Sequence, residues 1–128
     1  ELEQRVIALM RGLLRSMLRQ ANKVERFKNS LNPLDALHAK YDGSSGDPVV
    51  ADHAWGHLQL DATSLFLLQL GQLTRGGCAV IRSRDEADFI QNLIRIIFNA
   101  HKFKGPLYKA TDLTKLYHQN ILAFINNE

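Results

Sequence analysis

Apolar residues return every three or four positions through much of the chain, and this spacing predicts helices. Over residues 2–21, Leu, Met and Val recur at the period of one helix face, and most other residues there are good helix formers. The pattern predicts a first helix that ends near Asn22 or continues to Phe27. Turn-forming residues at positions 29–33 then interrupt it.

The second predicted helix begins at Asp61 and ends before Gly76 and Gly77. The Asp61 carboxylate can cap free backbone N–H groups at a helix start, and glycine is the usual residue where a helix stops. The body of this helix, residues 65–70, is apolar on nearly every side. We therefore expect other helices to enclose it. Residues 41–57, before it, are rich in turn formers and predict a loop.

The third predicted helix has a distinct start signal. Ser83 and Glu86 have the spacing of a capping box, in which the serine accepts a hydrogen bond from the Glu86 backbone and the glutamate side chain bonds back. The helix then carries one apolar stripe: Ile90, Leu93, Ile94, Ile97 and Phe98. After Gly105 and Pro106, residues 111–126 predict a fourth, weaker helix.

The predicted fold class is all-α, because no segment shows the sustained alternation of a strand. One fully apolar helix between amphipathic ones indicates an inner and an outer layer, as in a toroid of helical hairpins. About four helices make a small bundle but do not close such a toroid. We therefore expect this chain of 128 residues to be part of a larger domain, or a shortened version of one.

The composition is that of an ordinary soluble globular protein, with 45% hydrophobic and 23% charged residues. No apolar run approaches the roughly 20 residues needed to span a bilayer, so no transmembrane segment is predicted. The single cysteine, Cys78, excludes an internal disulfide and indicates a reducing compartment. The net charge of +3 is too small to indicate nucleic acid by itself. The chain begins at Glu1 without an initiator methionine, so we expect a fragment or a renumbered chain.

Several blocks of the chain, in order and in register, resemble one protein family. The longest are residues 55–64, Trp-Gly-His-Leu-Gln-Leu-Asp-Ala-Thr-Ser, and residues 85–93, Asp-Glu-Ala-Asp-Phe-Ile-Gln-Asn-Leu. Shorter matches are Leu9-Met10-Arg11-Gly12-Leu13-Leu14, Arg19-Gln20, Lys23-Val24-Glu25 and Leu37-His38-Ala39-Lys40-Tyr41. Together they cover residues 1–100, and they resemble the regulatory subunits of phosphorylase kinase, the α subunit more than the β subunit.

This resemblance implies an amino-terminal glucoamylase-like domain, an (α/α)6 toroid, which agrees with the two layers expected from periodicity. It implies a non-catalytic regulatory or scaffolding role in a kinase complex that controls glycogen breakdown by phosphorylating glycogen phosphorylase. The implied partners are the catalytic γ subunit, the β subunit, the calmodulin-like δ subunit and calmodulin, and no cofactor is implied. The resemblance also implies a cytoplasmic assembly. The full-length subunit, prenylated at a distant carboxyl end, would bring it to the cytoplasmic face of the plasma membrane.

The resemblance stops after Ala100, and this predicts two parts. Residues 1–100 are expected to form a partial glucoamylase-like helical domain, and residues 101–128 a divergent helical tail. The family continues with an aromatic segment containing Trp-Glu-Arg-Gly, whereas this chain reads His-Lys-Phe-Lys-Gly-Pro from residue 101. An alternative transcript end and a mispredicted exon would each account for such a tail.

The glucoamylase-like interpretation places Trp55, Gln59 and Asp61 at the mouth of the toroid, as candidate sugar-binding residues. An aromatic ring can stack on a sugar, while an amide and a carboxylate bind its hydroxyl groups. Glycoside hydrolysis needs two carboxyl groups about 5–9.5 Å apart, and the segment bearing the acid is missing here, so no catalytic residue is predicted. The structural alternative is that Asp61 caps its helix and Trp55 fills the core beside Gly56.

Arg11, Arg15, Arg19 and Lys23 recur every four residues and form a basic ridge along the first helix. A basic helix with an apolar opposite side is the general shape of a calmodulin target, so the basic ridge is a candidate contact for calmodulin or another acidic partner. The alternatives are a solvated outer face, or salt bridges to residues absent from this chain. No aromatic residues interleave with the ridge, so nucleic acid is not a predicted partner.

Neither the two histidines of the loop nor the single cysteine predicts a metal or catalytic site. His53 and His57 are four apart but flank a loop, and no third ligand is evident, so no metal site is predicted. Cys78 precedes Ala79, Val80 and Ile81 and is expected to be a small buried apolar residue. It is not a predicted nucleophile, because no local arrangement with a histidine suggests a base for its thiol.

Overall fold

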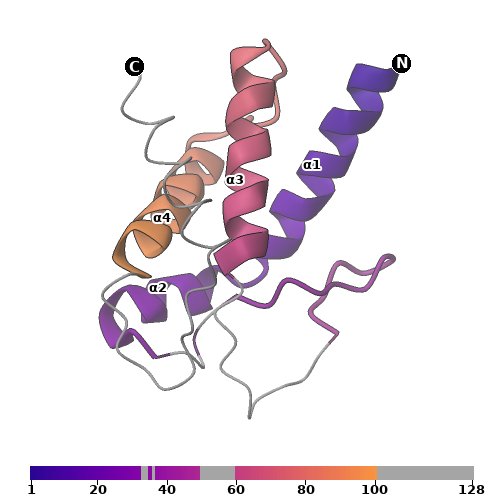
Figure 1. The fold of residues 1–128 in the computed structure, drawn as a ribbon. Helices are drawn as coiled ribbons and strands as arrows, with labels where there is room; N and C mark the ends of the chain where they lie inside the picture. The colour runs from indigo at the N-terminus through magenta and orange to yellow at the C-terminus, as the bar shows by residue number, and fades with distance from the viewer. Residues whose placement is uncertain (33–34, 36, 50–59, 101–128) are drawn as a thin grey trace.

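A computed structural model describes residues 1–32, 35, 37–49 and 60–100 of the chain (Figure 1). In these residues there are four helices: α1 (Leu2–Leu18), α2 (Ala21–Ser30), α3 (Leu60–Arg75) and α4 (Arg84–Ala100). The same residues contain no strand, only an isolated bridge between Tyr41 and Pro48. The all-α class is therefore confirmed. The predicted helix over residues 111–126 lies outside the described residues.

The first predicted helix is two helices, so its expected continuation to Asn22 or Phe27 was wrong. Arg19 and Gln20 form a turn between α1 and α2. The Gln20 side chain is buried, donates to the His38 carbonyl at 3.0 Å and accepts from the His38 N–H at 2.9 Å. It also donates to the Tyr41 hydroxyl at 3.3 Å. These contacts with residues far along the chain fix the turn, and helical periodicity does not report them.

A short hairpin follows α2, and its Asp47 pairs with Arg19 just after the end of α1. Asp42 closes it, because its carboxylate accepts hydrogen bonds from the backbone N–H groups of Ser44 and Ser45 at 2.9 and 2.8 Å. At the base of the hairpin the Tyr41 hydroxyl donates to the His38 carbonyl at 2.6 Å. Burial raises the pKa of Tyr41 to about 12, so the hydroxyl stays protonated and keeps this donor role at neutral pH. The loop predicted over residues 41–57 is confirmed up to residue 49, and residues 50–57 lie outside the described residues.

Helix α3 stops as the two glycines predict. Gly77 adopts a left-handed φ of 90°, the Cys78 N–H bonds the Leu73 carbonyl at 2.9 Å, and the Gly77 N–H bonds the Thr74 carbonyl at 3.0 Å. These two bonds are the Schellman arrangement that satisfies the last carbonyls of a helix. At the other end α3 begins at Leu60, so Asp61 lies within its first turn and not before it.

Helix α4 also begins at the predicted place. The Glu86 N–H bonds the Ser83 hydroxyl at 3.2 Å, as in a capping box. The Glu86 carboxylate reaches back one residue further than expected, to the Arg82 N–H at 2.7 Å. The apolar stripe is rotated from its predicted place, because Phe89 and Ile96 are buried while Phe98 is 49% exposed.

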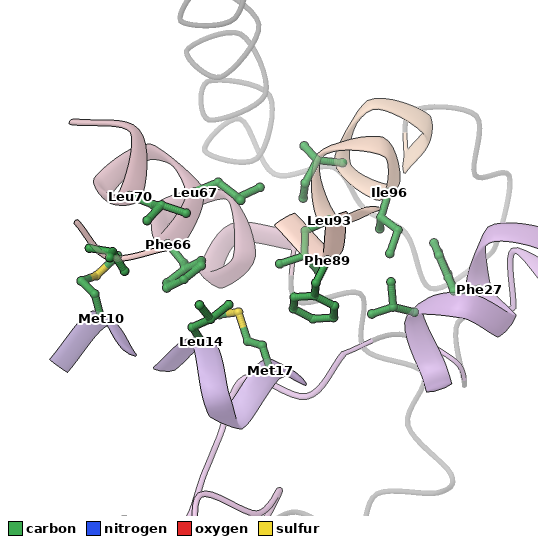
Figure 2. Close-up of a cluster of buried hydrophobic side chains, with 13 residues drawn as sticks. Met10, Leu14, Met17, Phe27, Phe66, Leu67, Leu70, Phe89, Leu93 and Ile96 are labelled. Carbon is green, nitrogen blue, oxygen red and sulfur yellow. The ribbon is translucent and has the colours of Figure 1, made fainter. Parts of the chain in front are cut away.

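One hydrophobic core joins the four helices (Figure 2). Its buried members are Met10, Leu14, Met17, Val24, Phe27, Phe66, Leu67, Leu70, Val80, Phe89, Leu93, Ile96 and Ile97. Helix α4 packs against both α2 and α3, and Figure 1 shows α3 between α1 and α4. The helices of this chain enclose α3 only in part, because Leu65 is 44% exposed. The full enclosure of α3 by other helices stays a prediction. In the part of the chain that the structure describes, no helix is long and apolar enough to cross a membrane.

Candidate functional site

The basic ridge does not form one continuous surface. Arg11 and Arg15 lie on α1, Arg19 lies in the turn after it, and Lys23 lies on α2. The turn at residues 19–20 breaks the four-residue period, so the side chains meet different surroundings. Each basic residue therefore has to be considered by its own contacts.

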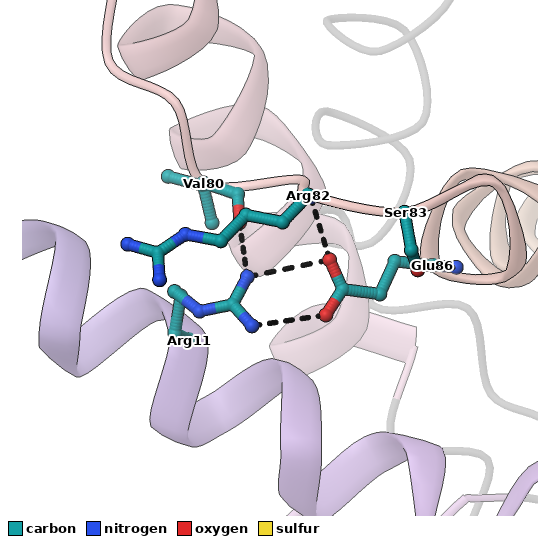
Figure 3. Close-up of polar contacts among 5 residues, drawn as sticks. All are labelled: Arg11, Val80, Arg82, Ser83 and Glu86. Atoms are coloured by element: carbon teal, nitrogen blue, oxygen red, sulfur yellow. Dashed lines mark hydrogen bonds and ion pairs between the residues drawn. The ribbon is translucent and has the colours of Figure 1, made fainter.

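Arg11 is held in the contact between α1 and the start of α4 (Figure 3). Its two terminal nitrogens bond the two carboxylate oxygens of Glu86 at 3.1 and 3.3 Å, a bidentate pair. The Arg11 Nη1 also donates to the Val80 carbonyl at 2.6 Å. The two paired side chains are 12% and 13% exposed, so water screens them little.

Glu86 therefore makes three contacts at one place. Its carboxylate pairs with Arg11 and accepts from the Arg82 N–H at 2.7 Å, while its backbone N–H donates to the Ser83 hydroxyl. The Arg11 hydrogen bond and then the Arg82 N–H hold the pKa of Glu86 below its usual value of 4.5. At neutral pH the group is ionised and connects α1 to the first turn of α4.

The other residues of the basic ridge are less constrained. Arg19 pairs with Asp47 of the hairpin at 2.5 Å, but the two side chains are 53% and 57% exposed. Arg15 is exposed and Lys23 is partly buried. Within the described ranges, neither Arg15 nor Lys23 makes an ion pair. Among the residues that the structure describes, two arginines of the basic ridge are thus internally paired, and two basic residues make no ion pair.

A pocket of about 410 Å³ opens beside the Arg11–Glu86 pair. We call it the arginine pocket, and it is lined by Gln4, Ile7, Ala8, Arg11, Arg15 and Arg82. Five of these residues come from α1, and Arg82 comes from the segment before α4. Figure 3 shows the Arg82 side chain directed back toward α1, while its backbone N–H faces Glu86.

The candidate sugar-binding residues are only partly within the described structure. Asp61 lies in the first turn of α3 and is exposed, where its negative charge is favourable for the helix dipole. Trp55 and Gln59 lie outside the described residues, as do His53 and His57. The sugar site therefore stays a prediction.

The remaining candidate groups show no site in the described residues. No cluster of three or more metal-ligating side chains occurs there. Cys78 is partly exposed and not buried as predicted, because it directly follows the helix stop at Gly77. Its sulfur lies 3.9 Å from the Glu3 carboxylate.

Sequence patterns missed Arg82 and Val80 as members of this region. Neither residue belongs to a periodic stripe, and both reach Arg11 or its pocket only through the packing of α1 against the segment before α4. The capping-box glutamate was the available signal. A capping box accounts for this carboxylate at the helix start, and local sequence does not reveal its pairing with Arg11 across 75 residues of sequence.

Comparisons with known proteins give the family of the chain. Residues 1–105 match the family described as glycosyl hydrolases family 15. The chain is 54% identical over 101 residues to the probable phosphorylase b kinase regulatory subunit alpha of Drosophila melanogaster. It is 55% identical over 102 residues to the liver isoform of this subunit in Mus musculus, and 56% identical over 102 residues to the skeletal muscle isoform in Oryctolagus cuniculus.

These matches cover 79–80% of this chain but only 8% of each relative. The chain thus spans about a twelfth of the length of the curated relatives that it matches. The family match also agrees with a glucoamylase-like helical fold for the four helices described above.

Proposed function

The chain belongs to glycosyl hydrolases family 15, and from this membership and its relatives we propose that it is a non-catalytic regulatory or scaffolding segment of a phosphorylase kinase. The observation that carries the proposal is the identity of 54–56% to regulatory subunits α over about four fifths of the chain. The chain would act by packing against other helices of the subunit, and not by chemistry of its own.

The finer parts of the proposal follow from what such a subunit does. The kinase that it restrains would control glycogen breakdown by phosphorylating glycogen phosphorylase. Its partners would be the catalytic γ subunit, the β subunit and the calmodulin-like δ subunit. The complex would be cytoplasmic, and a prenylated full-length subunit would bring it to the cytoplasmic face of the plasma membrane.

The described contacts support a scaffolding role. The Arg11–Glu86 pair and the Gln20–His38 contact both join segments far apart in the sequence, at the two ends of the packed part of α1. Contacts of this kind fix relative positions of helices. They engage both terminal nitrogens of Arg11 and the side-chain amide of Gln20 in contacts within the chain.

The test uses the full-length subunit that carries this segment. We expect it to purify together with a protein kinase and to make the activity of that kinase depend on calcium. Replacing Glu86 by Ala should reduce the assembled fraction, whereas replacing the exposed Asp88 on the same helix should not. A full-length product that neither associates with a kinase nor changes its calcium response contradicts the proposal.

A second candidate function is residual carbohydrate binding, favoured by the family-15 match and by the exposed carboxylate of Asp61. Trp55, the single tryptophan, would report binding through its fluorescence. Titration of the 128-residue chain with maltooligosaccharides should shift this fluorescence, and Asp61→Asn should weaken the effect. An unchanged spectrum at millimolar sugar would remove this candidate.

Calmodulin binding by the basic ridge competes with the fold itself. Met10, Leu14 and Met17, on the apolar side of α1, are buried in the core, and Arg11 is paired with Glu86. A synthetic peptide of residues 5–28 would expose this side, whereas the whole chain would have to release α1. If the peptide does not bind calcium-loaded calmodulin, the basic ridge is not a calmodulin target.

A further inference from the structure

We propose that the arginine pocket binds a phosphate group carried as a monoester. The pocket is defined by Gln4, Ile7, Ala8, Arg11, Arg15 and Arg82. This assignment does not depend on the proposed function, because it rests on three arginines that line one pocket.

The charges that line the pocket are unbalanced. Arg11 is neutralised by Glu86 in a bidentate pair. Arg15 and Arg82 line the same pocket, and among the described residues no carboxylate pairs with the side chain of either. Arg15 and Arg82 therefore bring two positive charges, unpaired among the described residues, to the lining of one pocket, and the two charges repel each other.

The geometry of the walls favours an anion with several oxygens. A guanidinium presents a planar fork of donors that matches phosphate, and Arg is the residue of choice for phosphate recognition. The lining also includes the amide of Gln4 as a further donor, and Ile7 and Ala8 as apolar residues. A phosphomonoester carries nearly two negative charges at neutral pH, which balances Arg15 and Arg82, whereas a single carboxylate would leave one of them unpaired.

Arg11 gives the pocket a fixed wall. Its terminal nitrogens are held by Glu86 and by the Val80 carbonyl, so the side chain is ordered before any ligand arrives. Its Nε is buried, and within the described part of the chain it has no hydrogen-bond partner. The acidic neighbour on α1, Glu3, does not line the pocket and lies against the Cys78 sulfur at 3.9 Å.

The experiment is a titration of the isotope-labelled 128-residue chain with glycerol 2-phosphate, followed by NMR at fixed ionic strength. We expect saturable shifts of the Arg Nε–H signals of Arg11, Arg15 and Arg82, with a dissociation constant on the order of millimolar for so open a site. Affinity should rise between about pH 5 and pH 7, because a phosphomonoester loses its second proton near pH 6. Acetate should bind about tenfold more weakly than the phosphomonoester.

Matched variants localise the effect. Arg15→Gln and Arg82→Gln each remove one unpaired charge and should weaken binding about tenfold, the loss expected for one hydrogen bond to a charged group. Arg82→Lys keeps the charge but loses the fork, so it should weaken binding less. Arg95→Gln removes an exposed arginine of α4 outside the pocket, and it should leave the affinity unchanged.

Three results would overturn the assignment. These are shifts that do not saturate, equal binding of acetate and phosphomonoester, and equal weakening by Arg82→Gln and Arg95→Gln. The melting temperature of each variant shows that its fold is kept. A phosphoserine peptide distinguishes two sources of the phosphate group. If it binds as tightly as glycerol 2-phosphate, a small phosphomonoester is a sufficient ligand. If it binds much more tightly, the ligand is a phosphorylated protein segment. Either of these two outcomes supports a phosphate site.

Discussion

Two arginines of the same basic ridge make ion pairs of different kinds. At the contact between α1 and α4, Arg11 makes a bidentate pair with Glu86, and both side chains are 12–13% exposed. At the hairpin contact, Arg19 meets Asp47 through one nitrogen, and both side chains are more than half exposed. The residues have the same chemistry and regular spacing, so the difference comes from what packs around them.

This difference indicates which of the two ion pairs stabilises the folded chain. A shielded bidentate pair that also bonds backbone groups is costly to disrupt, because the group left behind is buried without its partner. An exposed pair gains little, because water and salt screen it and two long side chains lose freedom. We therefore expect changes at the α1–α4 contact to affect stability much more than changes at the hairpin contact.

The largest effect is expected from the apolar residue that lies between the two contacts. Leu14 is fully buried on α1, and Leu14→Ala should lower the free energy of unfolding by about 3–4 kcal/mol through lost burial and the cavity left behind. Urea unfolding followed by circular dichroism measures this loss. The matched control is Leu9→Ala on the same helix, which should change stability by less than about 0.5 kcal/mol because Leu9 is 66% exposed. Equal losses in both variants would mean that α1 does not pack as described.

The second effect concerns the α1–α4 contact itself. Glu86→Ala should cost about 3 kcal/mol, because it leaves Arg11 shielded without its carboxylate and removes the acceptor for the Arg82 N–H. Asp88→Ala removes an exposed partner of Arg84 on the same helix and should cost about 0.5 kcal/mol or less. A Glu86 variant as stable as the Asp88 variant would show that the two kinds of ion pair do not differ.

The third effect is expected at the turn between α1 and α2. Gln20→Ala removes both hydrogen bonds to the main chain of His38 and should cost about 1–2 kcal/mol. Gln20→Glu keeps the acceptor but loses the amide donor, so we expect it to be less stable than the wild type as well. Urea unfolding of both variants checks the prediction. No loss in either would mean that another contact fixes the turn.

The sequence predicted the interactions between residues close together in the chain and missed those between residues far apart. The Ser83–Glu86 cap and the stop at Gly77 were predicted correctly, because both depend on residues within one turn. The break at Gln20 was missed, because its partner is 18 residues away. The partner of Arg11 was missed for the same reason, at 75 residues. Periodicity identifies a helix face but not which neighbour covers it.

Prediction of the arginine pocket from the sequence was limited in the same way. The charges of Arg11 and Arg15 were recognised, but their separation into a paired and an unpaired residue depends on how α4 packs against α1. Arg82 was not a candidate, because a single arginine between helices carries no pattern. Only the fold brings it into the arginine pocket with the residues of α1.

The fourth effect is the pH dependence of the α1–α4 contact. The pKa of Glu86 is lowered in the folded chain, so its contribution to stability is present above the unfolded pKa, near 4.5, and is lost as the pH falls through the folded pKa. Glu86→Gln should therefore lose less stability than the wild type on going from neutral pH into this acid range. Urea midpoints measured across that range test it, and parallel curves would mean that Glu86 titrates normally.

The smallest effect is expected at the hairpin contact. Arg19→Ala should change the free energy of unfolding by less than about 0.5 kcal/mol at moderate salt, and the interaction energy from a double-mutant cycle with Asp47→Ala should be of the same size. The same cycle with Arg11 and Glu86 should give a several-fold larger interaction energy, and added salt should change it less, because the pair is shielded. Equal interaction energies from the two cycles would mean that solvent exposure does not determine the strength of these ion pairs. The charge spacing along the chain would then be the better guide to their strength. A small interaction energy at the hairpin beside a large one at the α1–α4 contact would locate the electrostatic stabilisation of α1 at Arg11 and not at Arg19.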